Sequence, residues 1–211
     1  SAEEIAANPH FSDDAPGGIR IVDTNNDGSL TPEDRVALGT PYPDFTWGIT
    51  NTFQIKDFDI SFLIQGVQGI TVLNGDVYYN ETKKWNKKYT KNRWVSAEHP
   101  GDGKTPYQNV KTGHDLMLTD YPLQNASYAC LRNFTVGYTL PATAARKIKL
   151  SGVRFYVSGS NLLYIWGSGY KGINPESRMT SGNYSSAMIS GYQRGGFPLT
   201  STISAGFDIN F

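Results

Sequence analysis

The sequence lacks the features that mark several common classes of protein. Its 211 residues contain one cysteine, Cys130, which excludes an internal disulfide and a metal site built from several thiolates. Acidic and basic residues are equal in number, 19 of each, so no net charge favours nucleic acid or another partner of one sign. No run approaches the roughly 18 to 20 consecutive apolar residues that a transmembrane helix needs. The start of the chain also lacks the basic and apolar regions of a signal peptide, so if the protein is exported we expect its signal upstream of Ser1.

Aromatic residues and glycine are abundant instead. The chain has 13 Tyr, 10 Phe, 4 Trp and 22 Gly, while charged residues make up 18%, against about 25% in soluble domains. This composition is typical of β-structure with an amphipathic surface. It is compatible with a membrane, because a barrel strand needs only about 10 residues that alternate apolar with polar.

Five stretches show the period of two that identifies a strand with two unlike faces. They are 46–55, 58–65, 131–139, 153–164 and 203–211. In the third stretch, strict alternation places Arg132 on the same face as Phe134 and Tyr138. In the last stretch, the apolar face continues to Phe211.

The connections between these stretches differ in length in an ordered way. A two-residue link, 56–57, predicts a tight antiparallel hairpin, and 140–149 has room for one helical turn at 142–148. The other two connections, 69–125 and 166–198, are long and polar. Short turns at one end of a sheet and long loops at the other are typical of outer-membrane β-barrels. A soluble β-sandwich also alternates, but it rarely segregates loop length so strongly by side.

Six stretches resemble, in order, the C-terminal region of the SusC/RagA family of TonB-linked outer-membrane proteins. They are GIRIVDTNNDG at 18–28, LGTPYPDFTWG at 38–48, FLIQGVQG at 62–69, LRNFTVGYTLP at 131–141, VRFYVSGSNLL at 153–163 and FDINF at 207–211. Each is modest alone, but together they cover the chain from near one end to the other.

This resemblance implies an all-β fold, an antiparallel transmembrane β-barrel of about 22 strands around an N-terminal plug, with long extracellular loops. Residues 1–45 would form an extracellular loop, and residues 46–211 would supply the C-terminal strands. The implied protein is not an enzyme but an importer of glycans or peptides in the outer membrane of a Gram-negative bacterium. Its implied partners are a SusD-like lipoprotein lid and TonB, with no nucleic acid. Since five strands cannot close a barrel, we expect the sequence to be a fragment of a longer chain or one chain of a barrel that another chain completes.

One motif carries recognisable chemistry, a loop of oxygen-bearing side chains that begins at Asp23. The predicted calcium ligands are Asp23, Asn25, Asp27, Ser29 through its carbonyl, Thr31 and Asp34, with Gly28 at the turning position of the loop. The twelfth position is Asp34 where an EF-hand has Glu, and Glu33 is a possible substitute. The competing interpretation is a turn followed by a short helix, with Thr31 as N-cap and Asp34 as the acid three residues later. Both interpretations can hold at once.

The remaining candidates point to no catalytic site. His10, His99 and His114 share no metal-ligand spacing, and no nucleophile motif or phosphate-binding loop is present. Aromatic residues among lysines in the first long connection could contact cargo or a lid, or could pack the loop; they are Tyr78, Tyr79, Trp85, Tyr89 and Trp94. The alternative function left open is a secreted, calcium-stabilised β-sandwich that binds glycans at a cell surface.

Overall fold

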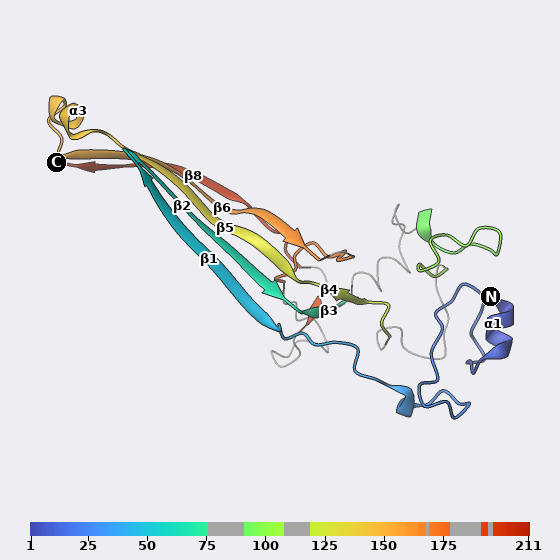
Figure 1. Cartoon of the computed structure of the whole chain (residues 1–211). Coiled ribbons are helices and arrows are strands. Elements are labelled where there is room, and N and C mark those ends of the chain that lie inside the picture. The colour runs from blue at the N-terminus through green and yellow to red at the C-terminus, as the bar shows by residue number, and fades with distance from the viewer. Residues whose placement is uncertain (76–90, 108–118, 168, 178–190, 194–195) are drawn as a thin grey trace. The chain divides into compact units, whose positions relative to one another are not determined.

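A computed structural model of the chain describes residues 1–75, 91–107, 119–167, 169–177, 191–193 and 196–211 (Figure 1). The chain divides into two compact units, which are described separately. One comprises residues 42–70, 125–177 and 197–211, and the other comprises 1–41, 71–124 and 178–196. No helix among the described residues is long and apolar enough to cross a membrane.

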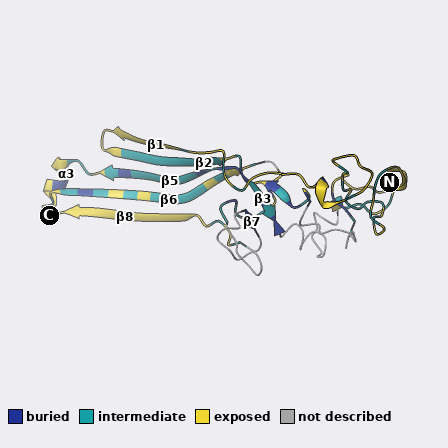
Figure 2. Cartoon of the chain, turned by 90° about the horizontal axis from the view of Figure 1, so that it is seen from below, coloured by how far each residue is buried: buried dark blue, intermediate teal, exposed yellow. Residues whose placement is uncertain are grey.

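The first unit is built around a five-stranded antiparallel sheet. Its strands are β1 (Phe45–Ile55), β2 (Phe58–Gln68), β5 (Tyr128–Thr139), β6 (Gly152–Trp166) and β8 (Thr202–Asn210), in the order β1-β2-β5-β6-β8. Each strand pairs with the next member of the sheet along the chain, which leaves β1 and β8 at the two edges (Figure 2). The five strands lie where the alternation of residues predicts them, and the antiparallel fold is confirmed.

The short connections lie together at one end of this sheet. Lys56, with a positive φ of 54°, and Asp57 join β1 to β2. The helix α3 (Ala142–Lys147) lies between β5 and β6, as the sequence predicts. The Thr139 N–H donates to the Asp57 carbonyl at 2.8 Å, so the two turns form one rim. Both long connections leave from the opposite end of the sheet, so one end carries short turns and the other carries long loops.

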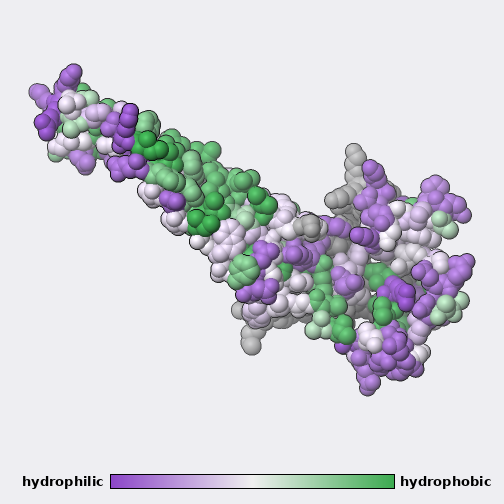
Figure 3. All heavy atoms as spheres, viewed as in Figure 1, coloured by the Kyte–Doolittle hydropathy of each residue, from purple (hydrophilic) through white to green (hydrophobic). Residues whose placement is uncertain are grey.

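The sheet has one apolar face, and this face is exposed. Phe58, Tyr138, Phe155 and Phe207 are register partners across four neighbouring strands, and the next row holds Ile60, Val136, Val157 and Ala205. Phe155 is 51% exposed and Phe207 65% exposed, and Figure 3 shows hydrophobic residues gathered along the strands. A soluble β-sandwich would bury such a face against a second sheet. All the strands that lie wholly in the described part of this unit belong to the one sheet, so this unit itself supplies no second sheet to cover the face.

Alternation within β5 and β6 is interrupted by two β-bulges, and one prediction is wrong for this reason. Leu63 and Ile64 on β2 pair with Asn133 and Leu131 on β5, so Arg132 is an extra residue between them. A second irregularity follows in β6, where Asn161 takes a positive φ of 54°. Because one extra residue reverses the parity of a strand, Arg132 lies on the polar face and not beside Phe134.

The second unit contains short elements. They are α1 (Ala2–Ala7), the 3-10 helix η1 (Pro32–Asp34) and a small sheet of β4 (Leu123–Asn125), β3 (Thr71–Asn74) and β7 (Tyr192–Gln193), in which β3 and β7 are parallel. Val72 and Asn74 on β3 are almost fully buried, and Asn74 donates to the Gln124 side-chain oxygen at 3.0 Å. The first long connection therefore contains short strands that the sequence, with no sustained period there, did not indicate.

Candidate functional site

Charged side chains gather on the polar face of the five-stranded sheet, opposite the exposed apolar rows. Arg154 on β6 forms a two-pronged ion pair with Asp59 on β2, with Nε to Oδ1 at 3.0 Å and Nη2 to Oδ2 at 2.6 Å. Arg154 Nη1 also donates to Asp208 Oδ2 on β8 at 3.4 Å. One guanidinium therefore connects three strands on this face.

A glycine on the intervening strand makes this ion pair possible. Gly137 on β5 is the register partner of both Asp59 and Tyr156, so it lies between the two charged strands. A Cβ atom at Gly137 would collide with the Asp59 carboxylate and the Arg154 guanidinium. The missing side chain leaves the space across which Arg154 reaches Asp59.

A second network surrounds Arg132, at the bulge. Its Nη2 donates to Glu176 Oε1 at 2.6 Å, and its Nη1 donates to Asn161 Oδ1 at 2.8 Å and to the Tyr164 hydroxyl at 3.0 Å. The Tyr164 hydroxyl also donates to Glu176 Oε1 at 2.9 Å. The Arg132 and Glu176 side chains are 22% and 28% exposed, so this ion pair is only partly accessible to solvent.

Glu176 belongs to the loop that follows β6, so the Arg132 network holds this loop against the polar face. Within the loop, the Glu176 N–H donates to Asn174 Oδ1 at 2.9 Å, and the Asn174 side chain donates to the Phe197 carbonyl at 3.1 Å. At the bulge, the Ser201 hydroxyl donates to the Asn161 carbonyl at 2.7 Å. The first bulge thus places Arg132 beside Glu176 of the loop, and the second places Asn161 beside Ser201, which precedes β8.

The predicted helix cap in the Asp23 loop is confirmed. Thr31 is the N-cap of η1, and Asp34 completes a capping box by accepting the Thr31 N–H at 2.8 Å. The other Asp34 oxygen accepts the Thr24 N–H at 2.8 Å, so the carboxylate joins the two ends of the loop. These backbone donors, that of Thr31 first, hold the pKa of Asp34 below its ordinary value. Both carboxylate oxygens are thus already hydrogen-bonded to the backbone.

Four of the predicted calcium ligands, Asp23, Asn25, Asp27 and Ser29, lie on one turn. Asp23 accepts the backbone N–H groups of Asp27 and Gly28, and Asp27 accepts that of Ser29 at 2.8 Å. Asn25 Oδ1 also accepts the Asp27 N–H at 3.0 Å. Among the described residues, no group of three or more His, Cys, Asp or Glu side chains is arranged to hold a metal ion. Asp23 and Asp34 both accept backbone N–H groups with each carboxylate oxygen, so hydrogen bonding does not separate the predicted ligands. Calcium binding through Asp23, Asn25, Asp27, Ser29, Thr31 and Asp34 stays a prediction.

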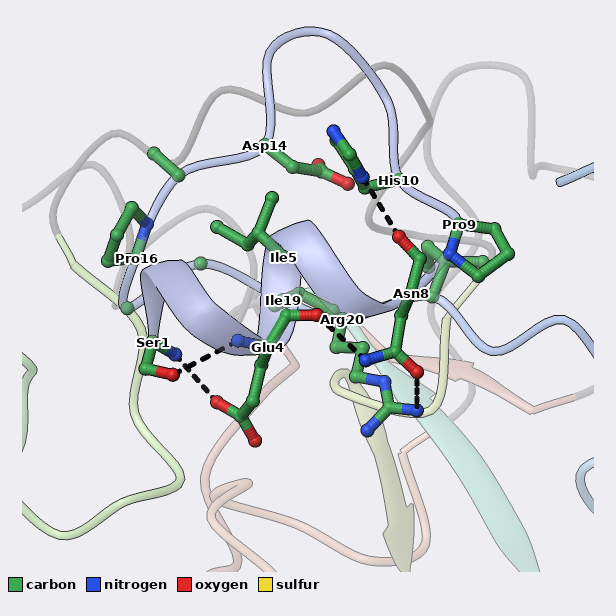
Figure 4. Close-up of a pocket in the computed structure, with 14 residues that line it drawn as sticks. Ser1, Glu4, Ile5, Asn8, Pro9, His10, Asp14, Pro16, Ile19 and Arg20 are labelled. Atoms are coloured by element: carbon green, nitrogen blue, oxygen red, sulfur yellow. Dashed lines mark hydrogen bonds and ion pairs between the residues drawn. The ribbon is translucent and has the colours of Figure 1, made fainter. Parts of the chain in front are cut away.

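A pocket in the second unit lies between α1 and the segment that follows it (Figure 4). Its polar groups are hydrogen-bonded to one another: Arg20 donates to Asn8 Oδ1 at 3.0 Å, and the Asn8 side chain donates to the Glu4 carbonyl at 2.7 Å. The ring of His10 contacts the Asn8 carbonyl at 2.9 Å. The side chains that could recognise a ligand are therefore used in holding the segment together, and we assign no site here.

Of the aromatic residues predicted to contact cargo or a lid, only Trp94 is among the described residues; Tyr78, Tyr79, Trp85 and Tyr89 lie outside them, as does His114. Trp94 packs against Gly17, where a Cβ atom would collide with the indole, and its ring is 6.4 Å from that of Tyr107. Packing of the loop, which the sequence left open, accounts for Trp94.

Comparison with known proteins identifies relatives over the whole chain. TonB-dependent receptor P26 of Formosa agariphila is 30% identical over 100% of this chain and 21% of the relative's length. TonB-dependent receptor SusC of Bacteroides thetaiotaomicron is 27% identical over 74% of this chain and 15% of its own length. The chain belongs to the SusC/RagA family of TonB-dependent receptors. The relatives named here are TonB-dependent receptors and not enzymes, as predicted for this chain.

Solved structures agree on the fold of this SusC/RagA chain. The structure of the RagAB peptide transporter has a TM-score of 0.62 and 21% identity, covering 82% of this chain and 18% of that one. An open-open state of the RagAB peptide importer has a TM-score of 0.59 at 21% identity. No protein-family model matches the chain. The chain spans about a fifth of the length of its relatives, as a C-terminal region of such a receptor would.

The two charged networks are the features of the candidate site that sequence analysis missed. The sequence did carry a signal for the Arg154 network, because Asp59, Arg154 and Asp208 are charged residues at polar-face positions of their strands. The second network had no usable signal, because its assembly depends on the bulges and on the return of Glu176 from a loop.

Proposed function

We propose that the chain forms the C-terminal wall of a β-barrel that imports nutrients through the outer membrane of a Gram-negative bacterium. The observation that carries this proposal is the contrast between the two faces of one sheet. Exposed aliphatic and aromatic rows suit contact with hydrocarbon, whereas paired charges suit a hydrated lumen. The two edge strands, β1 and β8, would pair with the remaining strands of the barrel, because an unpaired edge is unfavourable in lipid.

Fractionation of cells tests this proposal directly. The complete receptor that contains this chain should sediment with outer membranes and require detergent for extraction. Recovery in the soluble fraction without detergent would instead support the secreted glycan-binding β-sandwich.

The orientation in the membrane follows from the segregation of connections. The rim that carries the 56–57 turn and α3 would face the periplasm, and the two long connections and the Asp23 loop would lie outside the cell. A protease specific for lysine, added to intact cells, should cut at Lys104 and leave Lys149 intact. Cutting at Lys149 with Lys104 protected would reverse the orientation.

The partners follow from the family. A SusD-like lipoprotein would cover the extracellular end, TonB would act on the part of the receptor that precedes this chain, and the cargo would be a glycan or a peptide. Uptake of labelled oligosaccharides and of labelled oligopeptides by cells with and without the receptor distinguishes the two cargo classes. Co-purification of a surface lipoprotein with the receptor tests the lid.

The Asp23 loop would bind one calcium ion through oxygens of the predicted ligands, which are Asp23, Asn25, Asp27, the Ser29 carbonyl, Thr31 and Asp34. Oxygen donors on a tight turn suit a hard cation. Asp34 would serve both as helix cap and as ligand, because a carboxylate oxygen that accepts one N–H keeps a second lone pair. Isothermal titration of the receptor with calcium, compared with Asp27→Ala and with Glu33→Gln, tests the assignment. Equal heats for all three proteins would refute it.

A further inference from the structure

Basic side chains are concentrated on the rim of short turns. Lys56 lies in the first turn, and Arg146, Lys147 and Lys149 lie at the end of α3 and just after it. The only acidic residue in the segments 56–57 and 140–151 is Asp57. The chain as a whole has no net charge, so this excess of positive charge is local.

These basic residues are not used within the described structure. All four are exposed, and none forms an ion pair with another described residue. The arginines of the polar face, Arg132 and Arg154, are both paired with carboxylates. The charges of the rim are therefore available to a partner.

The depth of the rim follows from the row of Phe58, Tyr138, Phe155 and Phe207 on the apolar face. Aromatic girdles of this kind mark the boundary between hydrocarbon and head groups. Lys56 lies two residues beyond Phe58, which corresponds to about 7 Å along a strand. The head-group layer on each side of a bilayer is roughly 5 to 8 Å thick. Lys56 and α3, which shares its rim, would lie at the level of the head groups.

An apolar residue lies among the basic ones. Ile148 follows α3 and is 57% exposed, with Lys147 and Lys149 on either side of it. An exposed isoleucine flanked by cations is suited to a bilayer surface, where the aliphatic chain enters the acyl boundary and the ammonium groups reach phosphates. Figure 3 shows the hydrophobic strands next to the hydrophilic end that carries α3.

We propose that Lys56, Arg146, Lys147 and Lys149 form a docking surface for the head groups of anionic phospholipids in the periplasmic leaflet. The inference rests on the proposed barrel and its orientation, and it adds a lipid partner. Its arguments are the continuity of the rim with the lipid-facing rows and the match of its charge to a phosphodiester. Each basic residue near an anionic bilayer contributes about a fivefold gain in binding.

The test uses the complete receptor in nanodiscs of phosphatidylcholine that contain a minor fraction of spin-labelled lipid. The spin-labelled lipid is either phosphatidylglycerol or phosphatidylcholine, and the measured quantity is the protein-bound fraction of each. The rim variant is R146Q/K147Q/K149Q. The matched control, R35Q/K91Q/K104Q, also removes three positive charges, one arginine and two lysines, but from exposed positions outside the rim. A charge-conserving variant, R146K/K147R/K149R, separates loss of charge from a disturbed turn.

The wild type, the control and the charge-conserving variant should prefer phosphatidylglycerol, and salt should weaken this preference. The rim variant should lose a large part of it, up to about a hundredfold for three charges. An unchanged preference in the rim variant, or none in the wild type, would overturn the proposal. A receptor that does not insert into bilayers would instead fail the fractionation test, so the proposed barrel and the lipid surface fail in different experiments.

Discussion

The Arg132–Glu176 pair should hold the loop after β6 against the polar face of the sheet. We predict that Glu176→Gln or Arg132→Gln releases this loop while the strands stay paired. Hydrogen bonds to charged groups contribute about 1.5 to 3 kcal/mol, and fully exposed ion pairs about 0 to 1 kcal/mol. The Arg132 and Glu176 side chains are only 22% and 28% exposed, so their pair resembles a hydrogen bond to a charged group more than an exposed ion pair. Breaking it should therefore cost about 2 kcal/mol.

Amide hydrogen exchange of the reconstituted receptor measures this effect locally. The N–H groups of Glu176 and Ser177 donate to Asn174, so their exchange reports opening of the loop. A loss of 2 kcal/mol corresponds to about thirtyfold faster exchange of these two amides. Amides of β5 and β6 should exchange as in the wild type, since their ladder is intact. The double variant should exchange little faster than either single variant, because both remove the same interaction.

The matched control is Arg154→Gln, which breaks the other ion pair on the same face. It removes a guanidinium from the same sheet but touches no residue of the loop, so exchange at Glu176 and Ser177 should be unchanged. Equal acceleration by Arg154→Gln would mean that the loop responds to the charge of the whole face. Wild-type exchange in Glu176→Gln would refute the role of the pair.

Three further predictions concern the two faces of the sheet, Gly137 on β5 and the Asp34 cap of η1. Phe134→Arg, near the middle of the apolar face, should destabilise the barrel to urea by about 2 to 4 kcal/mol, whereas Phe155→Arg in the aromatic row should cost about 1 kcal/mol or less. Thr135→Arg, on the polar face, is the control, and equal losses in all three variants would show that the faces are misassigned. Gly137→Ala should cost about 1 to 3 kcal/mol by displacing the ion pair across β5, and this loss should shrink once that ion pair has been removed. The pKa of Asp34 is lowered in the folded loop, so its ionised form stabilises the loop at any pH above the unfolded-state pKa of about 3.9. This stability is lost as the pH falls through the folded-state pKa. Exchange of the amides at the ends of the loop should accelerate in that range, and Asp34→Asn should remove this pH dependence.

The strands and their connections could be predicted because each depends on local order in the sequence. A period of two requires only neighbouring residues, and the tight turn at Lys56 and the helix α3 follow from segment length. The cap of η1 was predictable for the same reason, since Thr31 and Asp34 are three residues apart. The pairing of Arg154 with Asp59 could not be predicted from local order, because these residues are 95 positions apart and meet only through the register of β5.

The bulge at Arg132 shows where local reasoning fails and what signal remains. Strict alternation through 131–139 assigned Arg132 to the apolar face, and the extra residue in β5 places it on the other. The trace of the bulge in the sequence is the succession of two polar residues, Arg132 and Asn133, between Leu131 and Phe134. A charged residue that falls on a lipid face by alternation, next to a second polar residue, should therefore be interpreted as a change of register. An arginine facing hydrocarbon would be unfavourable by several kcal/mol at mid-depth, whereas a bulge costs only a locally disrupted ladder and turns the guanidinium toward Glu176.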